Sequence, residues 1–150
     1  MEVDFYIKSL SKQEILNLLE ANNEAHYEKL SNLVNLDTYS EKLSKYAINF
    51  TCYQQDKLVG LCACYFNDYV TKIGYISGIS FLNEYRSLGL GSKLIRLVIE
   101  YAKENSFKEI HITPDCNNNV LINFLEKNGF LKDKKIANRC LLKYTIKEAN

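Results

Sequence analysis

The chain has 150 residues, of which 47% are hydrophobic and 25% charged, and its net charge is +1. This length and composition predict a single domain, residues 1–150, with a core large enough to need no disulfides. The balanced charge offers no basic surface to nucleic acid, and no apolar run approaches the roughly 18 residues of a membrane span. The five cysteines are odd in number and include no CxxC pair, which argues against a disulfide framework or a zinc site. We therefore expect a reduced, cytoplasmic protein without a nucleic-acid or membrane partner.

The first half of the chain predicts strands and two helices. Ser11 and Glu14 have the spacing of a capping box, which marks the start of a helix. A turn near Gln55 and Asp56 joins two runs of strand-forming residues, as in a hairpin. The expected elements are a strand at 3–8, a helix that begins after Ser11, a polar connecting stretch at 22–33, a helix at about 37–47, and strands at 49–55 and 57–66.

The second half alternates strands with helices, which predicts an α/β domain with one β-α-β crossover. Gly129 follows a helical pattern whose apolar residues are at 120, 121, 124 and 125, at a position where a left-handed conformation costs glycine little. The cluster of Lys132, Lys134 and Lys135 around Asp133 favours a solvated hairpin turn. The expected elements are a strand at 73–82, a helix after the glycines at 89 and 91, a strand at 109–113, a helix at 120–128, a strand at 139–146, and one more short strand near 130–131.

Two glycines stand where a strand turns into a helix, in the stretch EYRSLGLGSKL at 84–94. A helix N-terminus exposes unpaired N–H groups and a partial positive charge. Gly89 and Gly91 carry no Cβ that would keep an anion away, and Arg86 adds charge nearby. The stretch therefore predicts a site for a phosphate or pyrophosphate. It is neither a Walker P-loop nor a dinucleotide fingerprint, because the glycine spacings differ.

The pattern Arg-x-x-Gly-x-Gly at 86–91 resembles the acetyl-CoA signature of the GNAT superfamily, the GCN5-related N-acetyltransferases. The residues before it, FLNEYR at 81–86, occupy the place of the family's V-x-P-x-Y-R. Further along the chain, the spacing of the family's closing N-x-x-A-x-x-x-Y-x-x-x-G-F motif recurs at Asn118, Leu121, Leu125, Gly129 and Phe130. The resemblance implies the acyl-CoA N-acyltransferase fold: a mixed, mostly antiparallel sheet of six or seven strands flanked by about four helices.

The resemblance also implies which residues hold acetyl-CoA as the donor cosubstrate. Backbone groups on the strand before the loop would bind the pantetheine arm, and one N–H there would polarise the thioester carbonyl. Asn118 matches an asparagine that contacts the cofactor, although it could equally be a helix N-cap. The expected binding residues are Ile79, Ser80 and Phe81 for pantetheine, Arg86, Ser87, Leu88, Gly89, Leu90, Gly91 and Ser92 for the pyrophosphate, and Asn118.

The groups that move protons depart from the family pattern. Leu125 stands where the family often has a tyrosine that protonates the leaving thiolate, and a leucine has no proton to give. Water or one of Tyr65, Tyr69 and Tyr75 could supply that proton instead. His111 occupies the place of the glutamate that many members carry on the fifth strand, and an imidazole titrates close enough to neutral pH to accept a proton from the amine. A solvent-exposed strand histidine is the alternative.

The sequence leaves the acceptor open, and we expect a primary amine of a small molecule. Carboxylates and tyrosines suit a small cationic amine, and the parts that bind the acceptor in such folds supply Glu24, Tyr27, Glu28, Tyr39, Tyr65, Asp68 and Tyr69. His26 lies in a polar segment that often borders the acceptor, with an ordinary surface position as the alternative. A homodimer is left open. The leading hypothesis is an N-acetyltransferase that works by direct attack in a ternary complex. The alternatives are a CoA-binding module without catalytic activity and an interaction subunit that has lost the cofactor.

Overall fold

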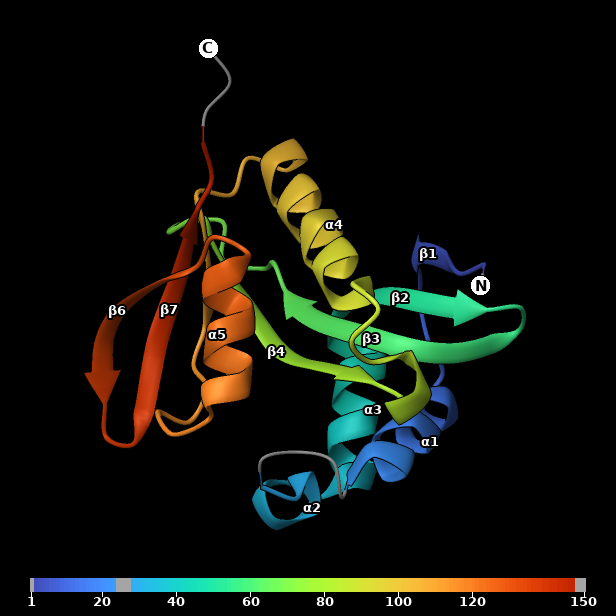
Figure 1. The fold of residues 1–150 in the computed structure, drawn as a ribbon. Coiled ribbons are helices and arrows are strands. Elements are labelled where there is room, and N and C mark those ends of the chain that lie inside the picture. Colours follow the sequence, from blue (N-terminus) through green and yellow to red (C-terminus); the bar gives the residue numbers. More distant parts are fainter. Residues whose placement is uncertain (1, 24–27, 148–150) are drawn as a thin grey trace. The chain divides into compact units, whose positions relative to one another are not determined.

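The structure is a computed structural model that describes residues 2–23 and 28–147. The seven strands of its mixed sheet follow the order β1-β2-β3-β4-β5-β7-β6 (Figure 1). This α/β architecture with a mostly antiparallel sheet confirms the expected fold class. The elements are β1 (Asp4–Ile7), α1 (Lys12–Asn22), α2 (Leu30–Leu33), α3 (Leu36–Tyr46), β2 (Ile48–Gln54), β3 (Lys57–Tyr65), β4 (Ile73–Phe81), the 3-10 turn η2 (Asn83–Tyr85), α4 (Leu90–Glu104), β5 (Glu109–Ile112), α5 (Asn119–Lys127), β6 (Leu131–Ile136) and β7 (Arg139–Thr145).

The chain forms two compact units. One combines Met1–Tyr65 with Ser77–Leu97, and the other combines Phe66–Ile76 with Val98–Asn150. Two elements, β4 and α4, therefore begin in one unit and end in the other. Each unit has its own buried apolar residues, and each is described by itself below.

The first unit packs α1 and α3 together beside an antiparallel β1-β2-β3 sheet (Figure 1). The β2–β3 hairpin turns at Gln55, which adopts a positive φ of 54°, as expected from the Gln55-Asp56 turn. Buried side chains from both layers form the core, including Ile15, Leu43 and Phe50. Cys62 and Cys64 are buried on β3.

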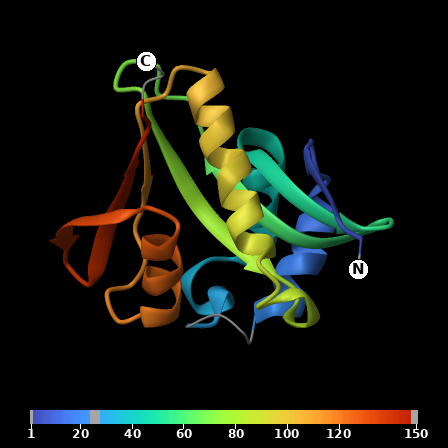
Figure 2. The same cartoon turned by 45° about the horizontal axis from the view of Figure 1, so that its top comes forward.

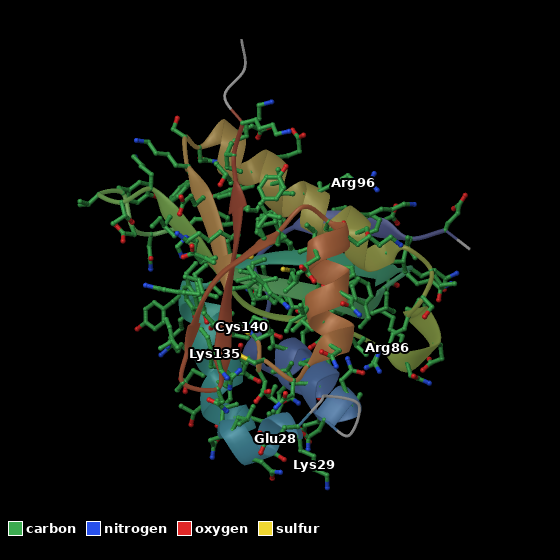
Figure 3. The ribbon with its side chains drawn as sticks, turned by 60° about the vertical axis from the view of Figure 1, so that its left-hand side comes forward. Glu28, Lys29, Arg86, Arg96, Lys135 and Cys140 are labelled. Atoms are coloured by element: carbon green, nitrogen blue, oxygen red, sulfur yellow. The ribbon has the colours of Figure 1, made fainter. Side chains whose placement is uncertain are left out.

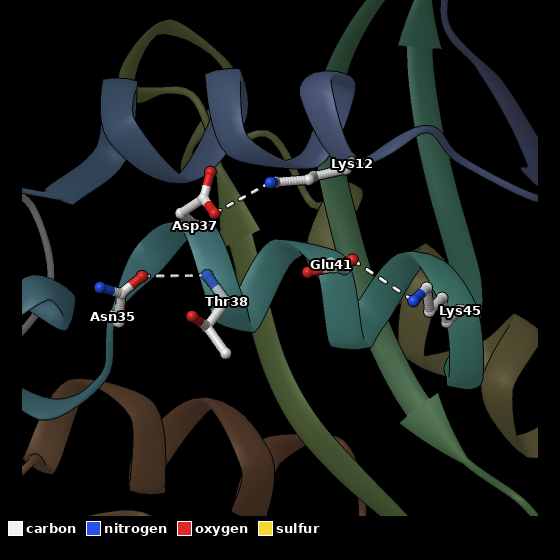
Figure 4. Close-up of polar contacts among 6 residues, drawn as sticks. All are labelled: Lys12, Asn35, Asp37, Thr38, Glu41 and Lys45. Carbon is white, nitrogen blue, oxygen red and sulfur yellow. Dashed lines mark hydrogen bonds and ion pairs between the residues drawn. The ribbon is translucent and has the colours of Figure 1, made fainter.

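Local side-chain caps explain where the two main helices of this unit begin. The capping box predicted for α1 is present, with Ser11 accepting from the Glu14 N–H and Glu14 accepting from the Ser11 N–H. For α3, Asn35 accepts from the Thr38 N–H at 3.0 Å. Figure 4 shows this cap together with the ion pair between Lys12 of α1 and Asp37 of α3, at 2.9 Å. These contacts fix the start of α3 against α1.

The second unit pairs the start of β4 with β5 in parallel and β5 with β7 in antiparallel, and the β6–β7 hairpin completes it (Figure 2). Its core includes a cluster of aromatic rings around Phe66, whose centroid lies 4.9 Å from that of Phe107 and 5.1 Å from that of Tyr101. Gly74 makes room for this cluster, because a Cβ at that position would lie 2.2 Å from the Phe66 ring.

Three sequence expectations need correction. The lysine cluster at 132–135 lies within strand β6 and does not form a turn. All six residues of β6 are exposed, and such an edge strand carries lysines that discourage pairing with other chains. The polar stretch before α3 contains the short helix α2. On α5, Val120 is 84% exposed and the buried stripe is formed by Ile122 and Leu125, because Asn118 caps the helix and places Val120 in its exposed first turn.

Candidate active site

The loop between η2 and α4 presents backbone donors at the start of a helix. The first N–H of this segment that bonds to the helix backbone is that of Lys93, which donates to the Gly89 carbonyl at 3.3 Å. The N–H groups of residues 90–92 precede it, and N–H groups at the start of a helix have no intrahelical partner and suit an anion. Ser87 and Gly89 both adopt left-handed conformations, with φ of 61° and 78°. A Cβ built on Gly89 meets no described atom within 4 Å, so this position is open on the side where an anion would approach.

Arg86 has a structural role that the sequence did not reveal. Its Nε donates to the Phe81 carbonyl at 3.0 Å, and its Nη2 donates to Asn22 Oδ1 at 3.2 Å. The guanidinium therefore ties the end of α1 to the end of β4 at the entrance of the loop, and its contribution to phosphate binding stays a prediction. Figure 3 shows Arg86 on this loop and Arg96 on α4. Lys93 and Arg96 are exposed cations near the start of α4.

The residues expected to bind pantetheine lie at the carboxyl end of β4, immediately before this loop. Ile79 and Ser80 are half-buried, and Phe81 is 8% exposed. The Phe81 ring packs directly against the backbone of Gly60 on β3, because a Cβ at Gly60 would lie 2.2 Å from the ring. The first unit thus brings together all the expected donor-site residues except Asn118.

A hydroxyl group of α3 and one of β4 form a hydrogen-bonded pair just before these residues. Tyr39 Oη and Ser77 Oγ are 2.6 Å apart. A Cβ at Gly78 would lie 3.3 Å from Tyr39 Oη, which places the phenol beside the β4 backbone. Sequence reasoning missed this pair because Tyr39 and Ser77 are separated by 38 residues.

His111 and Glu109 form a dyad on β5 in the second unit. His111 Nε2 lies 2.7 Å from Glu109 Oε1, and Lys143 Nζ lies 3.9 Å from the same oxygen. Because a carboxylate accepts hydrogen bonds, this contact favours the arrangement in which Nε2 carries the proton and Nδ1 is left as the acceptor nitrogen. Ile110 and Ile112 are buried on the opposite face of the strand. The strand predicted at 109–113 is confirmed, and the His111 side chain is 17% exposed rather than fully solvated.

Asn118 and Leu125 both have structural roles in α5. Asn118 is the N-cap, and its Oδ1 accepts from the Leu121 N–H at 3.2 Å. A contact between Asn118 and the cofactor therefore stays a prediction that would use the remaining amide donors. Leu125 is fully buried, which confirms that it packs in the core.

The three tyrosines considered as proton donors have different surroundings. The Tyr65 hydroxyl is buried without a hydrogen-bond partner among the described residues, and burial raises the pKa of its phenol. Tyr69 is 64% exposed and packs on Phe107. Tyr75 Oη shares a hydrogen bond with Thr113 at 2.7 Å.

Three of the cysteines have raised thiol pKa values. Burial raises the pKa of Cys52 to about 11 and holds that of Cys64 well above its ordinary value. A hydrogen bond to Cys140, a residue of β7 (Figure 3), raises the pKa of Cys116. The active nucleophile of a cysteine enzyme is the thiolate, which needs a lowered pKa. Covalent catalysis by any of these three thiols is therefore disfavoured.

The described part of the chain offers neither a metal site nor a helix that could cross a membrane. Within residues 2–23 and 28–147, no cluster of three or more His, Cys, Asp or Glu side chains could hold a metal ion. No helix in these ranges is both long enough and apolar enough to cross a membrane. Glu24, His26 and Tyr27, which we considered near the acceptor, lie outside the described residues.

The fold and the glycine loop at a strand-to-helix junction agree with the expected N-acetyltransferase class. Residues 12–130 match the model of the "Acetyltransferase (GNAT) family", and the chain belongs to this family. It is accordingly an enzyme that uses acetyl-CoA as the acetyl donor.

Individual relatives agree with this assignment. The N-alpha-acetyltransferase 30 of Schizosaccharomyces pombe is 24% identical over 108 residues, which cover 67% of this chain and 72% of the relative. The PaiA N-acetyltransferase of Thermoplasma acidophilum, solved in complex with coenzyme A, has a TM-score of 0.79 at 15% identity, covering 97% of this chain and 99% of that one. A spermidine N-acetyltransferase chimera from Vibrio cholerae and hSSAT has a TM-score of 0.75 at 15% identity, covering 97% and 96%.

Proposed function

We propose that the protein transfers the acetyl group of acetyl-CoA to a primary amine of a small molecule, by direct attack of the amine in a ternary complex. The observation that carries the donor half of this proposal is the loop at 87–92. Its two left-handed residues, together with the N–H groups that precede the first helical bond of α4, suit a pyrophosphate. The pantetheine arm would then lie along Ile79, Ser80 and Phe81, whose backbone leads directly into that loop.

Direct attack is supported by the state of the thiols. An acetyl-cysteine intermediate requires a nucleophilic thiolate, and the pKa of each of Cys52, Cys64 and Cys116 is raised. A ternary complex needs no such intermediate. It needs instead a base for the amine and an acid for the departing thiolate.

His111 is the base in this proposal. An alkyl ammonium near pKa 10 is mostly protonated at neutral pH and must lose a proton before it can attack. The Glu109 carboxylate holds the ring by its Nε2–H, which leaves Nδ1 as the basic atom and stabilises the imidazolium after proton transfer. The family resemblance implies that His111 stands at the position of the base, and its contact with Glu109 supports proton transfer by the ring.

The donor half is tested by calorimetry with acetyl-CoA and substitutions at Gly89. The Gly89→Asn variant keeps a residue that tolerates a positive φ, whereas Gly89→Val adds both backbone strain and a branched side chain. We expect Gly89→Val to lose about 2 kcal/mol or more of binding free energy, with Gly89→Asn intermediate. If folded Gly89→Val binds acetyl-CoA as well as the wild type, the loop is not the pyrophosphate site.

The acceptor half is tested by a panel of amines with a free-thiol readout for released CoA. The panel contains a polyamine, amino acids, an amino sugar and a peptide with a free N-terminus. The peptide is included because one relative is an N-alpha-acetyltransferase, and spermidine because another is named for it. Release of CoA with a small amine supports the proposal, and release with the peptide alone contradicts the small-molecule acceptor.

The alternative of a CoA-binding module without activity does not fit the family assignment, which makes the protein an acetyltransferase. Buried Leu125 therefore bears only on which group protonates the thiolate.

A further inference from the structure

The Tyr39 hydroxyl lies against β4, in a hydrogen bond with Ser77. The two hydroxyl oxygens are 2.6 Å apart, and a Cβ at Gly78 would lie 3.3 Å from Tyr39 Oη. Tyr39 lies in the first turns of α3, a helix anchored by its Asn35 cap and by fully buried Leu43. The phenol hydroxyl is therefore fixed beside the backbone of residues 77–78.

The direction of the bound donor places its sulfur near this pair, and this step rests on the proposed function. The carboxyl end of β4 leads into the pyrophosphate loop, so the arm must run from that end toward the amino end of the strand. If its amide groups pair with residues 79–81, the thioester lies at the next positions, Gly78 and Ser77. Phe81 and Ser77 are separated by about 13 Å at the rise of an extended strand, a distance in keeping with an extended arm.

We propose that Tyr39 is the general acid of the transfer and that Ser77 supports it. Ser77 Oγ–H donates to Tyr39 Oη, and Tyr39 Oη–H donates to the thioester sulfur. The amine nitrogen bonds to the carbonyl carbon, and the carbon–sulfur bond then breaks with its electron pair on sulfur. Sulfur takes the Tyr39 proton and leaves as the thiol. The proton that the amine lost to the base returns to the tyrosinate through solvent, which balances the cycle.

The acidities of the groups fit this exchange. A phenol near pKa 10 and an alkyl thiol near 8.5 differ little, so a proton moves readily between them in a positioned pair. The hydrogen bond from Ser77 favours the charged form of the phenol. A buried leucine at 125 leaves this proton to be supplied from another element, and α3 is the element that carries a hydroxyl to the β4 backbone at 77–78.

The test measures how much the sulfur atom contributes to binding. Calorimetry compares CoA with desulfo-CoA at about pH 9, where an alkyl thiol is largely ionised. The wild type should bind CoA more tightly than desulfo-CoA. A hydrogen bond to a charged group makes this preference about tenfold or more. Tyr39→Phe should abolish the preference while leaving the affinity for desulfo-CoA unchanged. Ser77→Ala should reduce the preference by about threefold, because it removes one neutral hydrogen bond.

Two further tyrosines serve as controls. Tyr46 lies on the same helix and is 68% exposed, so Tyr46→Phe should keep the full preference. Tyr65→Phe should also keep it. If Tyr65→Phe abolishes the preference, or if folded Tyr39→Phe retains it, Tyr39 is not the acid. If the wild type binds both ligands without any preference, this inference fails while the donor site stands, whereas failure to bind either ligand overturns the donor site itself.

Discussion

Two glycines offer a matched test of the donor site, because each lies directly under a phenylalanine ring. A Cβ at Gly60 would lie 2.2, 2.5 and 2.6 Å from three atoms of the Phe81 ring, and a Cβ at Gly74 would lie 2.2, 2.5 and 2.9 Å from three atoms of the Phe66 ring. Contacts below 3.0 Å are not tolerated, so the ring or the strand must shift in either alanine variant. Phe81 belongs to the proposed pantetheine site, whereas Phe66 belongs to the aromatic cluster of the second unit.

The expected cost in stability is similar for the two variants. Inserting a methyl group into a packed core costs about 1–3 kcal/mol, and the nearly equal overlaps place both substitutions in that range. Gly60→Ala should in addition displace Phe81, whose carbonyl accepts the Arg86 bond at 3.0 Å. Because Phe81 would bind the donor through its backbone, we expect a loss of about tenfold in acetyl-CoA affinity, equivalent to one net hydrogen bond. Gly74→Ala should leave that affinity unchanged.

Chemical denaturation measures the first effect and calorimetry with acetyl-CoA measures the second. The reasoning about ring positions is refuted if neither variant is destabilised. The assignment of β4 to pantetheine is refuted if Gly60→Ala is destabilised but binds acetyl-CoA as the wild type does. Equal losses of affinity in both variants would point to a general effect of destabilisation.

Three further predictions concern single side chains. Leu125→Ala should lower the free energy of unfolding by about 2–5 kcal/mol, as expected for a fully buried leucine, and a large loss of turnover in a protein that remains stable would contradict its packing role. If His111 is the base, kcat/KM should increase with pH as the imidazole loses its proton. His111→Gln should remove this increase and lower kcat/KM by roughly 10²-fold. An unchanged dependence of kcat/KM on pH with the true acceptor would exclude His111 as the base. Burial and the hydrogen bond to Glu14 raise the pKa of Tyr53 to about 12, so the folded state favours the neutral phenol. Its contribution to stability is complete below the unfolded value near 10 and is lost as the pH rises toward 12, and Tyr53→Phe should flatten this alkaline loss in denaturation curves.

Local patterns in the sequence predicted the local parts of the structure. The capping box at Ser11 and Glu14 involves residues three positions apart, so its geometry is specified by the sequence alone. Gly129 was expected at a helix end and has a φ of 95°. The Asn118 cap could be stated only as one of two alternatives, because an asparagine before a helix suits both a cap and a ligand.

Contacts between distant residues escaped prediction. The bond from Arg86 to Asn22 joins residues 64 positions apart, and an arginine in a glycine loop suggests an anion rather than a structural link. A short strand was expected near 130–131, and β6 begins at Leu131 and continues through the lysine cluster to Ile136. Its lysines suit an exposed edge strand, and the same composition is typical of a turn. A charge pattern reports exposure and does not distinguish these two structures.

The glycine motif predicts where the pyrophosphate binds, but it does not predict which side chains act as acid and base. The glycine loop presents backbone N–H groups, and many side chains can surround it without changing how it binds a pyrophosphate. The acid and the base depend on side chains at single positions, and the motif position for the acid is filled by buried Leu125. In our account the acid comes from α3, through the 2.6 Å contact between Tyr39 and Ser77, and the base comes from β5, through the 2.7 Å contact between His111 and Glu109. If both variants that remove these groups retain full turnover, water must carry both protons, and the enzyme would act mainly by holding the amine and the thioester in position.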